Sequence, residues 1–297
     1  MPHTLRHAIL GAGGVGGLMG ACLAKLGDPV TLVVRAESLA QYPEQLQLES
    51  PFGNFQVPIS KAVEVPPCDV LWITVKATQL DSALRSVTRP EAAGAVVPLL
   101  NGIDHVAALR AKYGAEKVIP ATIAVEAERV APAHIVHRSP FARLNMLSSG
   151  RALLGATIDG LGKLGFECRF IEDEPTLMWS KLVFLAPFAL STTAAGQPVG
   201  GVLSNPEWRE LALGCVREAC AVAQAEGARV DANAIIAGSG KFPPGMRSSM
   251  QKDVEQGNPP ELDAIAGPIL GGAARHGIGV PATQKLVAYI EAKCRKY

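Results

Sequence analysis

The segment Gly11-Ala12-Gly13-Gly14-Val15-Gly16 has the glycine spacing of a loop that binds phosphate groups. It follows a predicted strand and precedes a predicted helix, which is the context that this motif requires. The first glycine permits a tight turn, the second lets the backbone approach a pyrophosphate, and the third lets the helix pack closely on the strand. The first N–H groups of the helix favour a bound anion. The loop therefore predicts a dinucleotide-binding site, and a glycine-rich turn without a ligand is the alternative.

Arg35 stands at the end of the second predicted strand, where the type of cofactor is decided. NAD-binding domains usually place Asp or Glu there, about 20 residues after the loop, to bind the ribose 2′-hydroxyl. The planar fork of N–H donors on an arginine suits a 2′-phosphate instead. We therefore expect NADPH as the cofactor, against the alternative of a solvated surface arginine.

Two further polar residues, Lys76 and Asn101, each follow a predicted strand directly. In open α/β sheets the ligand lies beyond the carboxyl ends of the strands. We therefore expect both side chains at the same sheet edge as the glycine loop. Each of them taken alone is equally well explained as a loop residue that bonds local backbone groups.

Lys181 lies in a predicted helix among apolar neighbours on the same helix face, Met178, Phe184 and Leu185 among them. A solvated lysine normally occupies a polar face, so this one either extends to solvent along its aliphatic stem or points into a cleft. A partly desolvated ammonium loses its proton more readily, which suits a general acid beside a carbonyl substrate.

Glu261 and Ser249 are the remaining candidates, and each has a structural alternative. The segment Asn258-Pro259-Pro260-Glu261 has the pattern of a helix N-cap with a reciprocal glutamate, which would account for Glu261 without any catalytic role. Ser249 follows a loop rich in glycine and proline. A hydroxyl there suits a ligand carboxylate, although turn capping is the commoner role.

The elements that must position these residues change in type along the chain. Short apolar runs alternate with helical stretches up to about residue 171, and this order predicts a parallel sheet covered by helices. The predicted strands are His7–Leu10, Val30–Val34, Val70–Val75, Ala95–Leu100, Val118–Ile123 and Glu167–Ile171, with a hairpin of Leu46–Glu49 and Phe55–Ile59 and edge strands at Ile135–His137 and Arg143–Leu147. The predicted helices are Val15–Leu26, Leu80–Val87, Val106–Lys112, Ala152–Leu164, Pro175–Thr193, Pro206–Glu226, Leu262–Arg275 and Pro281–Lys293, the sixth with a capping box at Ser204-Asn205-Pro206-Glu207. We expect an α/β fold in which residues 1–172 form a Rossmann-type domain that binds NADPH and residues 173–297 form an all-α domain that binds the substrate.

Composition excludes several classes of function. The chain has 297 residues, 48% hydrophobic and 19% charged, with a net charge of +1, which argues against nucleic acid and against an anionic membrane surface as partners. The longest apolar run, Leu182–Leu190, is too short to span a bilayer. Six cysteines without metal-ligand spacing predict a reduced, cytoplasmic protein, and no metal site is expected.

Together these pieces resemble the ketopantoate reductase (2-dehydropantoate 2-reductase) family over essentially the whole chain. The matching segments stand in this order: the glycine loop, Arg35, Val75-Lys76, Leu100-Asn101-Gly102, Trp179-x-Lys181, Ser248-Ser249-Met250-x-x-Asp253, Glu261-x-Asp263, and Ala274–Pro281.

The resemblance implies an N-terminal Rossmann domain, a helical C-terminal domain, and reduction of a 2-oxo acid to a 2-hydroxy acid with NADPH. The best-known product of the family is (R)-pantoate, made for pantothenate biosynthesis. The family pattern makes Lys181 the group that polarises the carbonyl and donates the proton, and Glu261 the group that holds cofactor and lysine. It places Lys76 and Asn101 on the cofactor, Asn101 also near the substrate, and Ser249 on the substrate carboxylate.

This chain departs from the family at three positions that orient the substrate. Family members that act on ketopantoate usually carry asparagines where this chain has Leu185, Ala189 and Val199. A substrate hydroxyl buried there would lack amide partners. A paralogous reductase of a different 2-oxo acid is therefore an alternative.

Two other functions stay open from the sequence. An opine-type dehydrogenase on the same plan usually relies on a catalytic histidine, and His105 is the one to consider, although a surface position at a helix start explains it better. A non-catalytic NADPH sensor is the other. The apolar C-terminal helices also suit a homodimer.

Overall fold

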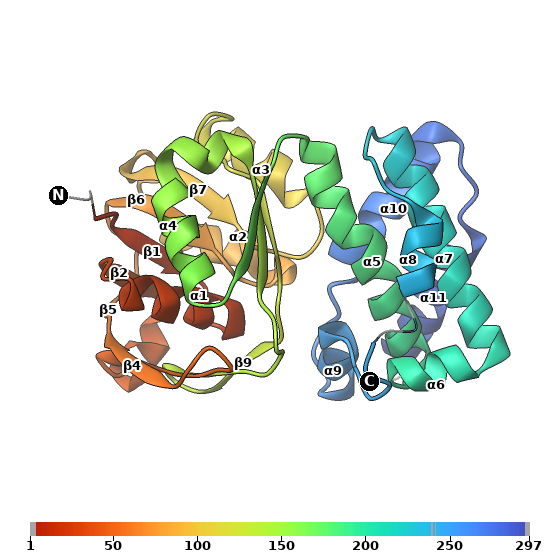
Figure 1. Ribbon diagram of the computed structural model, residues 1–297, viewed down its shortest axis with the longest axis horizontal. Helices are drawn as coiled ribbons and strands as arrows, with labels where there is room; N and C mark the ends of the chain where they lie inside the picture. The colour runs from red at the N-terminus through yellow and green to blue at the C-terminus, as the bar shows by residue number, and fades with distance from the viewer. Residues whose placement is uncertain (1–3, 239, 241, 295–297) are drawn as a thin grey trace. The chain divides into compact units, whose positions relative to one another are not determined.

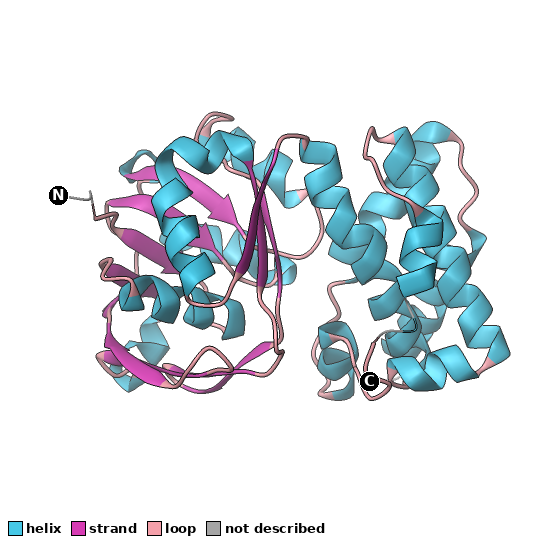
Figure 2. Cartoon of the chain, in the orientation of Figure 1, coloured by secondary structure: helices cyan, strands magenta, loops and turns pink. Residues whose placement is uncertain are grey.

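The computed structural model describes residues 4–238, 240 and 242–294, and the chain divides into two compact units (Figure 1). The first unit holds the chain up to Leu100 together with His105–Glu172. The second holds Asn101–Asp104 and the chain from Asp173 onward. The expected boundary at residues 172 and 173 therefore misses a four-residue segment, which the sequence assigned to the first domain. In the described residues, strands occur only in the first unit (Figure 2).

A five-stranded parallel sheet forms the centre of the first unit. Its strands are β1 (His7–Leu10), β2 (Val30–Val33), β5 (Ser60–Ala62), β6 (Cys68–Ile73) and β7 (Ala93–Pro98), in the spatial order β5-β2-β1-β6-β7. All four strand pairs are parallel. β1 and β6 are buried along most of their length, as strands covered on both faces must be. The order reverses between β1 and β6, and such a switch point is where doubly wound sheets bind ligands.

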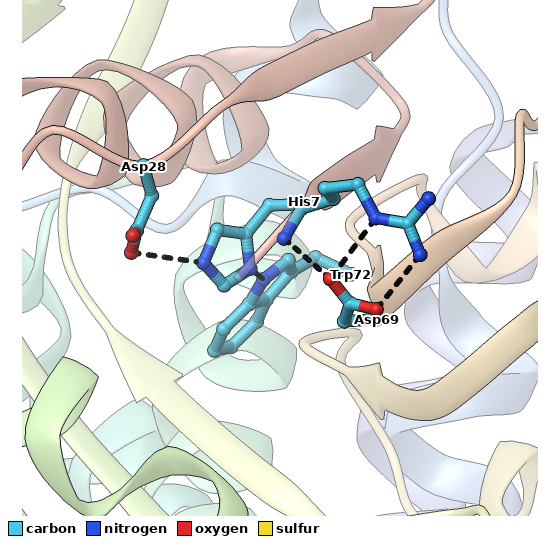
Figure 3. A network of polar contacts seen from close by, with 5 residues as sticks. His7, Asp28, Asp69 and Trp72 are labelled. Atoms are coloured by element: carbon cyan, nitrogen blue, oxygen red, sulfur yellow. Dashed lines mark hydrogen bonds and ion pairs between the residues drawn. The ribbon is translucent and has the colours of Figure 1, made fainter. Parts of the chain in front are cut away.

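A network of polar contacts fixes the amino ends of β1 and β6 (Figure 3). The buried indole of Trp72 donates from Nε1 to Nδ1 of His7 at 3.1 Å, and Nε2 of His7 therefore donates to Asp28 at 3.2 Å. Burial lowers the pKa of His7, which favours the neutral imidazole, and the bond from Trp72 selects the tautomer. At the surface, Arg6 donates to both carboxylate oxygens of Asp69. These bonds lie at the end of β1 opposite the glycine loop.

Two smaller sheets complete the strands of this unit. One has the order β4-β3-β10-β9, with β3 (Gln45–Glu49), β4 (Phe55–Pro58), β9 (Ala127–Ala131) and β10 (His134–His137). The other has the order β12-β11-β8, with β8 (Ala121–Ala124), β11 (Arg143–Leu147) and β12 (Glu167–Ile171). The hairpin of β3 and β4 is confirmed.

Three expectations for these strands are wrong. β10 and β11 were expected at sheet edges, yet each lies between two partners. The expected strand over residues 118–123 divides: Val118 forms one parallel bridge with Val96 of the central sheet, whereas β8 pairs antiparallel with β11. The pattern of apolar residues marked these segments as strands, but such a pattern carries no information about which sheet a strand joins.

The helices of the first unit are short, except for two. α1 (Gly14–Lys25) contacts β1 and β2 on one side and β3, β4, β9 and β10 on the other, so it lies between two sheets. The others are α2 (Leu80–Ala83), α3 (His105–Tyr113), α4 (Arg151–Lys163) and the 3-10 turns η1 (Ala36–Gln41), η2 (Ala77–Gln79), η3 (Leu84–Ser86), η4 (Pro90–Ala92) and η5 (Ser148–Gly150).

The second unit is helical and is built around one long helix, α5 (Glu174–Ala195). α6 (Val199–Ser204), α7 (Pro206–Ala225), α9 (Ser249–Glu255), α10 (Leu262–His276) and α11 (Pro281–Cys294) contact it, and α8 (Ala232–Gly238) packs on α7. Asp173 caps the start of α5 by accepting the N–H of Thr176, and Gly196 ends it in the left-handed conformation. The cap of α7 is Asn205, which accepts the N–H groups of Glu207 and Trp208. The third helical residue is then Trp208, so the expected capping box of Ser204 and Glu207 does not form.

α5 is long and apolar enough to cross a membrane by length and composition alone. Most of it is buried by the other helices, which is typical of the central helix of a bundle. Its apolar character is therefore explained by packing in the core of the second unit.

Candidate functional site

The glycine loop has the backbone conformation and the space that a bound pyrophosphate requires. Gly11 has φ +106°, and a Cβ there would lie 2.6 Å from the side chain of Val75. A Cβ on Gly16 would lie 2.2 Å from the carbonyl oxygen of Gly11, so helix α1 packs directly on the loop. A Cβ on Gly13, in contrast, would meet no atom within 4 Å. The middle glycine thus faces open space beside the start of a helix, which fits a dinucleotide phosphate.

Two side chains that the sequence analysis did not identify hold this loop. Thr74, directly after β6, donates from Oγ1 to the carbonyl oxygen of Gly11 at 2.7 Å. The buried Tyr42 donates from its hydroxyl to the carbonyl oxygen of Ala12 at 3.2 Å. A hydroxyl at the end of an apolar strand is a weak sequence signal for Thr74. Tyr42, 30 residues from its partner, gave none.

Arg35 and Lys76 each follow the carboxyl end of a strand of the central sheet, as expected. Arg35 follows β2 and stands at the N-cap of η1, and Lys76 follows β6 at the N-cap of η2. Both residues are exposed. The glycine loop follows β1, which lies between β2 and β6, so all three features belong to one edge of the sheet.

The second unit brings together Lys181, Asn101 and Glu261 in one chain of hydrogen bonds. The ammonium of Lys181 donates to Oδ1 of Asn101 at 3.0 Å, and Nδ2 of Asn101 donates to the carboxylate of Glu261 at 2.9 Å. An ammonium only donates and a carboxylate only accepts, so the two neighbours fix the orientation of the amide. The three residues are 80 and 160 positions apart in sequence.

The surroundings of Lys181 make it a weaker base than an ordinary lysine. Burial lowers the pKa of Lys181 to about 8, and the negative charge of Glu261 acts in the opposite direction. A group with a pKa near 8 is largely protonated at neutral pH and still releases its proton readily. The lysine therefore does not simply extend to solvent, because its ammonium is engaged by Asn101.

The short segment Asn101–Asp104 is held in the helical unit by the contacts of its two middle residues. Gly102 has φ +81°, and a Cβ there would lie 2.4 Å from the carbonyl oxygen of Ala264 in α10. Ile103 packs against the core of the second unit. A side chain at position 102 would push the segment away from α10, so glycine is what allows Asn101 to reach its two partners.

The capping interpretation of Glu261 is wrong. α10 begins at Leu262, and Glu261 occupies the N-cap position itself, without a side-chain hydrogen bond to the helix. The preceding residues are not helical, so the reciprocal bond of a capping box does not form. The buried Glu261 carboxylate instead accepts from Asn101.

The surroundings of Ser249 and His105 give no specific support for a role of either residue in the reaction. Ser249 is exposed at the start of α9, and it is Ser248 that caps this helix by accepting the N–H of Gln251. His105, expected at the surface, is buried at the start of α3 in the first unit. In the described residues no group of three or more His, Cys, Asp or Glu side chains could hold a metal ion.

The three positions that depart from the family pattern are apolar also in their surroundings. Ala189 belongs to the core of the helical unit, and Val199 is buried at the start of α6. Leu185 is half-buried, one turn after Lys181 on α5. Phe184 and Phe188, one turn apart on the same helix, stack with ring centroids 6.3 Å apart. The helix surface that follows Lys181 therefore offers few hydrogen-bonding groups.

Comparison with known proteins gives consistent matches along the whole chain. The family model "Ketopantoate reductase PanE/ApbA" matches residues 7–146, and "Ketopantoate reductase PanE/ApbA C terminal" matches residues 175–294. A 2-dehydropantoate 2-reductase of Caulobacter vibrioides is 30% identical over 296 residues, which cover 96% of this chain and 98% of the relative.

Solved structures give the same fold. A PanE/ApbA family ketopantoate reductase from Ralstonia eutropha JMP134 superposes with a TM-score of 0.86 at 25% identity, covering 98% of this chain and 99% of that one. D-mandelate dehydrogenase, solved with NADH and anilino(oxo)acetate, superposes with a TM-score of 0.86 at 21% identity over 98% and 99% of the two chains. The second likeness concerns the fold alone.

Proposed function

Because this chain belongs to the ketopantoate reductase family, we propose that it uses NADPH to reduce a 2-oxo acid to a 2-hydroxy acid, with 2-dehydropantoate as the first substrate to test. Members of this family are NAD(P)-dependent oxidoreductases that act on CH–OH groups. The observation that carries the proposal is the hydrogen-bonded trio of Lys181, Asn101 and Glu261, which holds a lysine of lowered pKa.

The roles in the proposed reaction follow from the chemistry of these groups. When bound, the reduced nicotinamide supplies a hydride, which adds to C2 of the 2-oxo acid. Lys181 polarises the C2 carbonyl and transfers one proton from its ammonium to the oxygen that becomes the hydroxyl. Solvent then returns the proton to the amine. A pKa of about 8 makes this transfer easier than it would be from an unperturbed lysine.

Asn101 and Glu261 keep the proton donor in place. Asn101 accepts one N–H of the ammonium and so leaves the others to point at the substrate oxygen. Glu261 fixes the amide and raises the pKa of Lys181, which opposes the effect of burial. The carboxylate thereby maintains the charged form of the lysine, which is the form that donates.

The cofactor is assigned to the first unit and the proton chemistry to the second. Gly11–Gly16 would cradle the pyrophosphate, with Arg35 on the 2′-phosphate and Lys76 on the cofactor as well. Support comes from the open space at Gly13 and from the exposed position of Arg35 after β2. Ser249 stays a prediction for the substrate carboxylate.

The substrate is tested with a matched pair of 2-oxo acids. The pair is 2-dehydropantoate and its analogue that lacks only the hydroxyl group, each offered with NADPH while loss of NADPH absorbance is followed. Sites that hydrogen-bond a substrate hydroxyl discriminate by about 10⁴–10⁵-fold against the analogue without it. With Leu185, Ala189 and Val199 in place of polar residues, we expect both acids to be reduced with efficiencies within about 10²-fold. No turnover with either acid or with a wider panel, alongside tight NADPH binding, would favour an NADPH sensor and overturn the proposal.

A reductase of a different 2-oxo acid is the second candidate, and the apolar surface after Lys181 favours it. If the analogue without the hydroxyl is the better substrate, the physiological acid carries an apolar substituent. The variant Leu185→Asn should then shift preference toward 2-dehydropantoate, because it returns an amide group to the half-buried position one turn after the lysine. The variant Val287→Asn, on α11, is the matched control for introducing an amide elsewhere in the helical unit.

A further inference from the structure

Strand β9 passes the phosphate-binding loop at close range. A Cβ added to Gly14, the first residue of α1, would lie 2.0 Å from the carbonyl oxygen of Ala127, the first residue of β9. Arg129 is two residues farther along the same strand and is exposed. A basic side chain therefore stands beside the loop on a strand that lies outside the central sheet and outside the glycine motif.

Tyr42 ties this arginine to the loop. Nη1 of Arg129 donates to the Tyr42 hydroxyl at 2.7 Å, and the same hydroxyl donates its proton to the carbonyl oxygen of Ala12. The carbonyl oxygen of Tyr42 accepts from Lys61, so the tyrosine is held at both ends. The guanidinium is thus fixed one side chain away from the loop backbone.

The charge of Arg129 is not neutralised by its neighbours. Glu128, adjacent on β9, pairs with Arg138 on the neighbouring part of the sheet. Within the described chain, the bond to Tyr42 is the one hydrogen bond that the Arg129 side chain makes, and this side chain forms no ion pair with a carboxylate there. A guanidinium carries five N–H groups, so four remain for a ligand.

Arg35 is the second basic residue near the glycine loop, and it belongs to the turn that precedes Tyr42. Arg35 stands at the N-cap of η1, and Tyr42 follows its last residue, so the turn connects one arginine to the anchor of the other. The guanidinium groups of Arg35 and Arg129 are therefore both connected, through η1 and Tyr42, to the glycine loop at the start of α1. This combination favours a ligand with more than one phosphate group.

We propose that Arg129 binds a phosphate of the dinucleotide and that Tyr42 is the positioning residue that holds Arg129 and the loop together. The inference rests on the proposed cofactor role of the glycine loop. NADPH carries phosphate in two places, the pyrophosphate and the 2′-phosphate, and an arginine recognises either one by the same paired N–H bonds. NADH lacks the 2′-phosphate, so a comparison of the two cofactors identifies the group that Arg129 contacts.

The test measures dissociation constants by calorimetry, without any substrate. Arg129→Gln keeps a polar side chain with N–H donors but removes the charge, and Arg138→Gln is the matched control on an exposed arginine that already has a carboxylate partner. We expect Arg129→Gln to weaken NADPH binding by about tenfold to hundredfold, as for the loss of hydrogen bonds to a charged group, and Arg138→Gln to leave it unchanged. A loss confined to NADPH assigns Arg129 to the 2′-phosphate, and an equal loss for NADH assigns it to the pyrophosphate. Unchanged binding of both cofactors overturns the inference.

Two further measurements separate the possible failures. If the unaltered protein binds neither cofactor, the proposed function itself fails, whereas normal binding that Arg129→Gln leaves intact defeats the Arg129 inference alone. Thermal melting of each variant shows that it is folded.

The role of Tyr42 is tested by a double-mutant cycle. Tyr42→Phe removes only the hydroxyl and so releases Arg129 while keeping its charge. We expect the loss of affinity in the double variant Tyr42→Phe with Arg129→Gln to be smaller than the product of the two single losses, because the residues act through one contact. Losses that multiply independently would show that Tyr42 acts on the loop alone and would overturn its positioning role.

Discussion

Replacing Glu261 by glutamine should move the pH dependence of the reaction to lower pH. Glutamine keeps the size of the side chain and an oxygen that accepts from Asn101, so the hydrogen-bonded trio persists without its negative charge. The charge of Glu261 raises the pKa of Lys181, which burial otherwise lowers to about 8. Removing the charge leaves burial unopposed, and the pKa of Lys181 falls further.

The size of this shift follows from the geometry of the trio. Two hydrogen bonds of 3.0 and 2.9 Å through a single amide join the ammonium to the carboxylate. This places the two charges at most about 8 Å apart, where an effective dielectric constant of about 20 gives an interaction of about 2 kcal/mol. That energy corresponds to about 1.5 pKa units. Because Lys181 is only half-buried and solvent screens part of the interaction, we expect a shift of about one unit.

The assay is the pH profile of kcat/KM for reduction, which reports the pKa values of the free enzyme. Lys181 must be protonated to donate, so kcat/KM falls as pH rises through its pKa. The fall should be centred near 8 in the unaltered protein and near about 7 in Glu261→Gln. Glu207→Gln removes an exposed carboxylate that pairs with Lys285 at the surface of the same unit, and it should leave the profile in place.

A profile of Glu261→Gln that keeps its midpoint, or moves it upward, would refute this reasoning. The first result would mean that the carboxylate does not act on the charge of Lys181. The second would mean that the titrating group is not a cation that Glu261 stabilises. In the second case the proton donor has to be sought elsewhere.

Three other variants test separate parts of the arrangement. Lys181→Met should lower kcat/KM by about 10²–10⁴-fold, the usual contribution of a general acid, while calorimetry finds NADPH binding unchanged; a variant that keeps full turnover would exclude the role. Arg35→Gln should weaken binding of NADPH while leaving that of NADH as it was, and equal effects on both would argue against a contact with the 2′-phosphate. Gly102→Ala should lower the free energy of unfolding by about 1–3 kcal/mol, measured as a lower melting temperature, because its φ is +81° and its Cβ would collide with Ala264. Gly227→Ala shares the positive φ but has no atom within 4 Å of the added Cβ, so it should cost less, and equal losses would show that the collision is relieved.

Four of the five strands of the central sheet could be predicted from sequence because their signals are local, whereas the short edge strand β5 was missed. Apolar, β-branched runs marked β1, β2 and β6 to within a few residues, and the glycine loop placed the start of α1. Lys181 was identified because a charged residue on an apolar helix face is a local anomaly. Asn101 was identified because it directly follows a predicted strand. Glu261 was a candidate for which the sequence favoured a structural explanation, and the ordered motifs supported both residues.

The parts that could not be predicted depend on contacts between distant residues. Nothing near Asn101 in sequence indicates that its amide joins Lys181 to Glu261. Tyr42 lies in a 3-10 turn region without a motif, and only the folded chain brings its hydroxyl to Ala12 and Arg129. The assignment of β8 to a separate sheet likewise depends on pairing partners, which periodicity does not specify.

The membership of Asn101–Asp104 in the helical unit has a consequence for exchanging parts between related proteins. A chimera that joins the first 172 residues of one relative to the helical part of another would combine the amide of one parent with the lysine and glutamate of the other. It would also pack residues 101–104 of one parent against the first turn of α10 from the other, where the backbone of Gly102 lies too close to Ala264 for any side chain. The residues of the proton-donating trio are therefore encoded in separate parts of the gene. A working hybrid has to take the four codons for Asn101–Asp104 from the same parent as the helices.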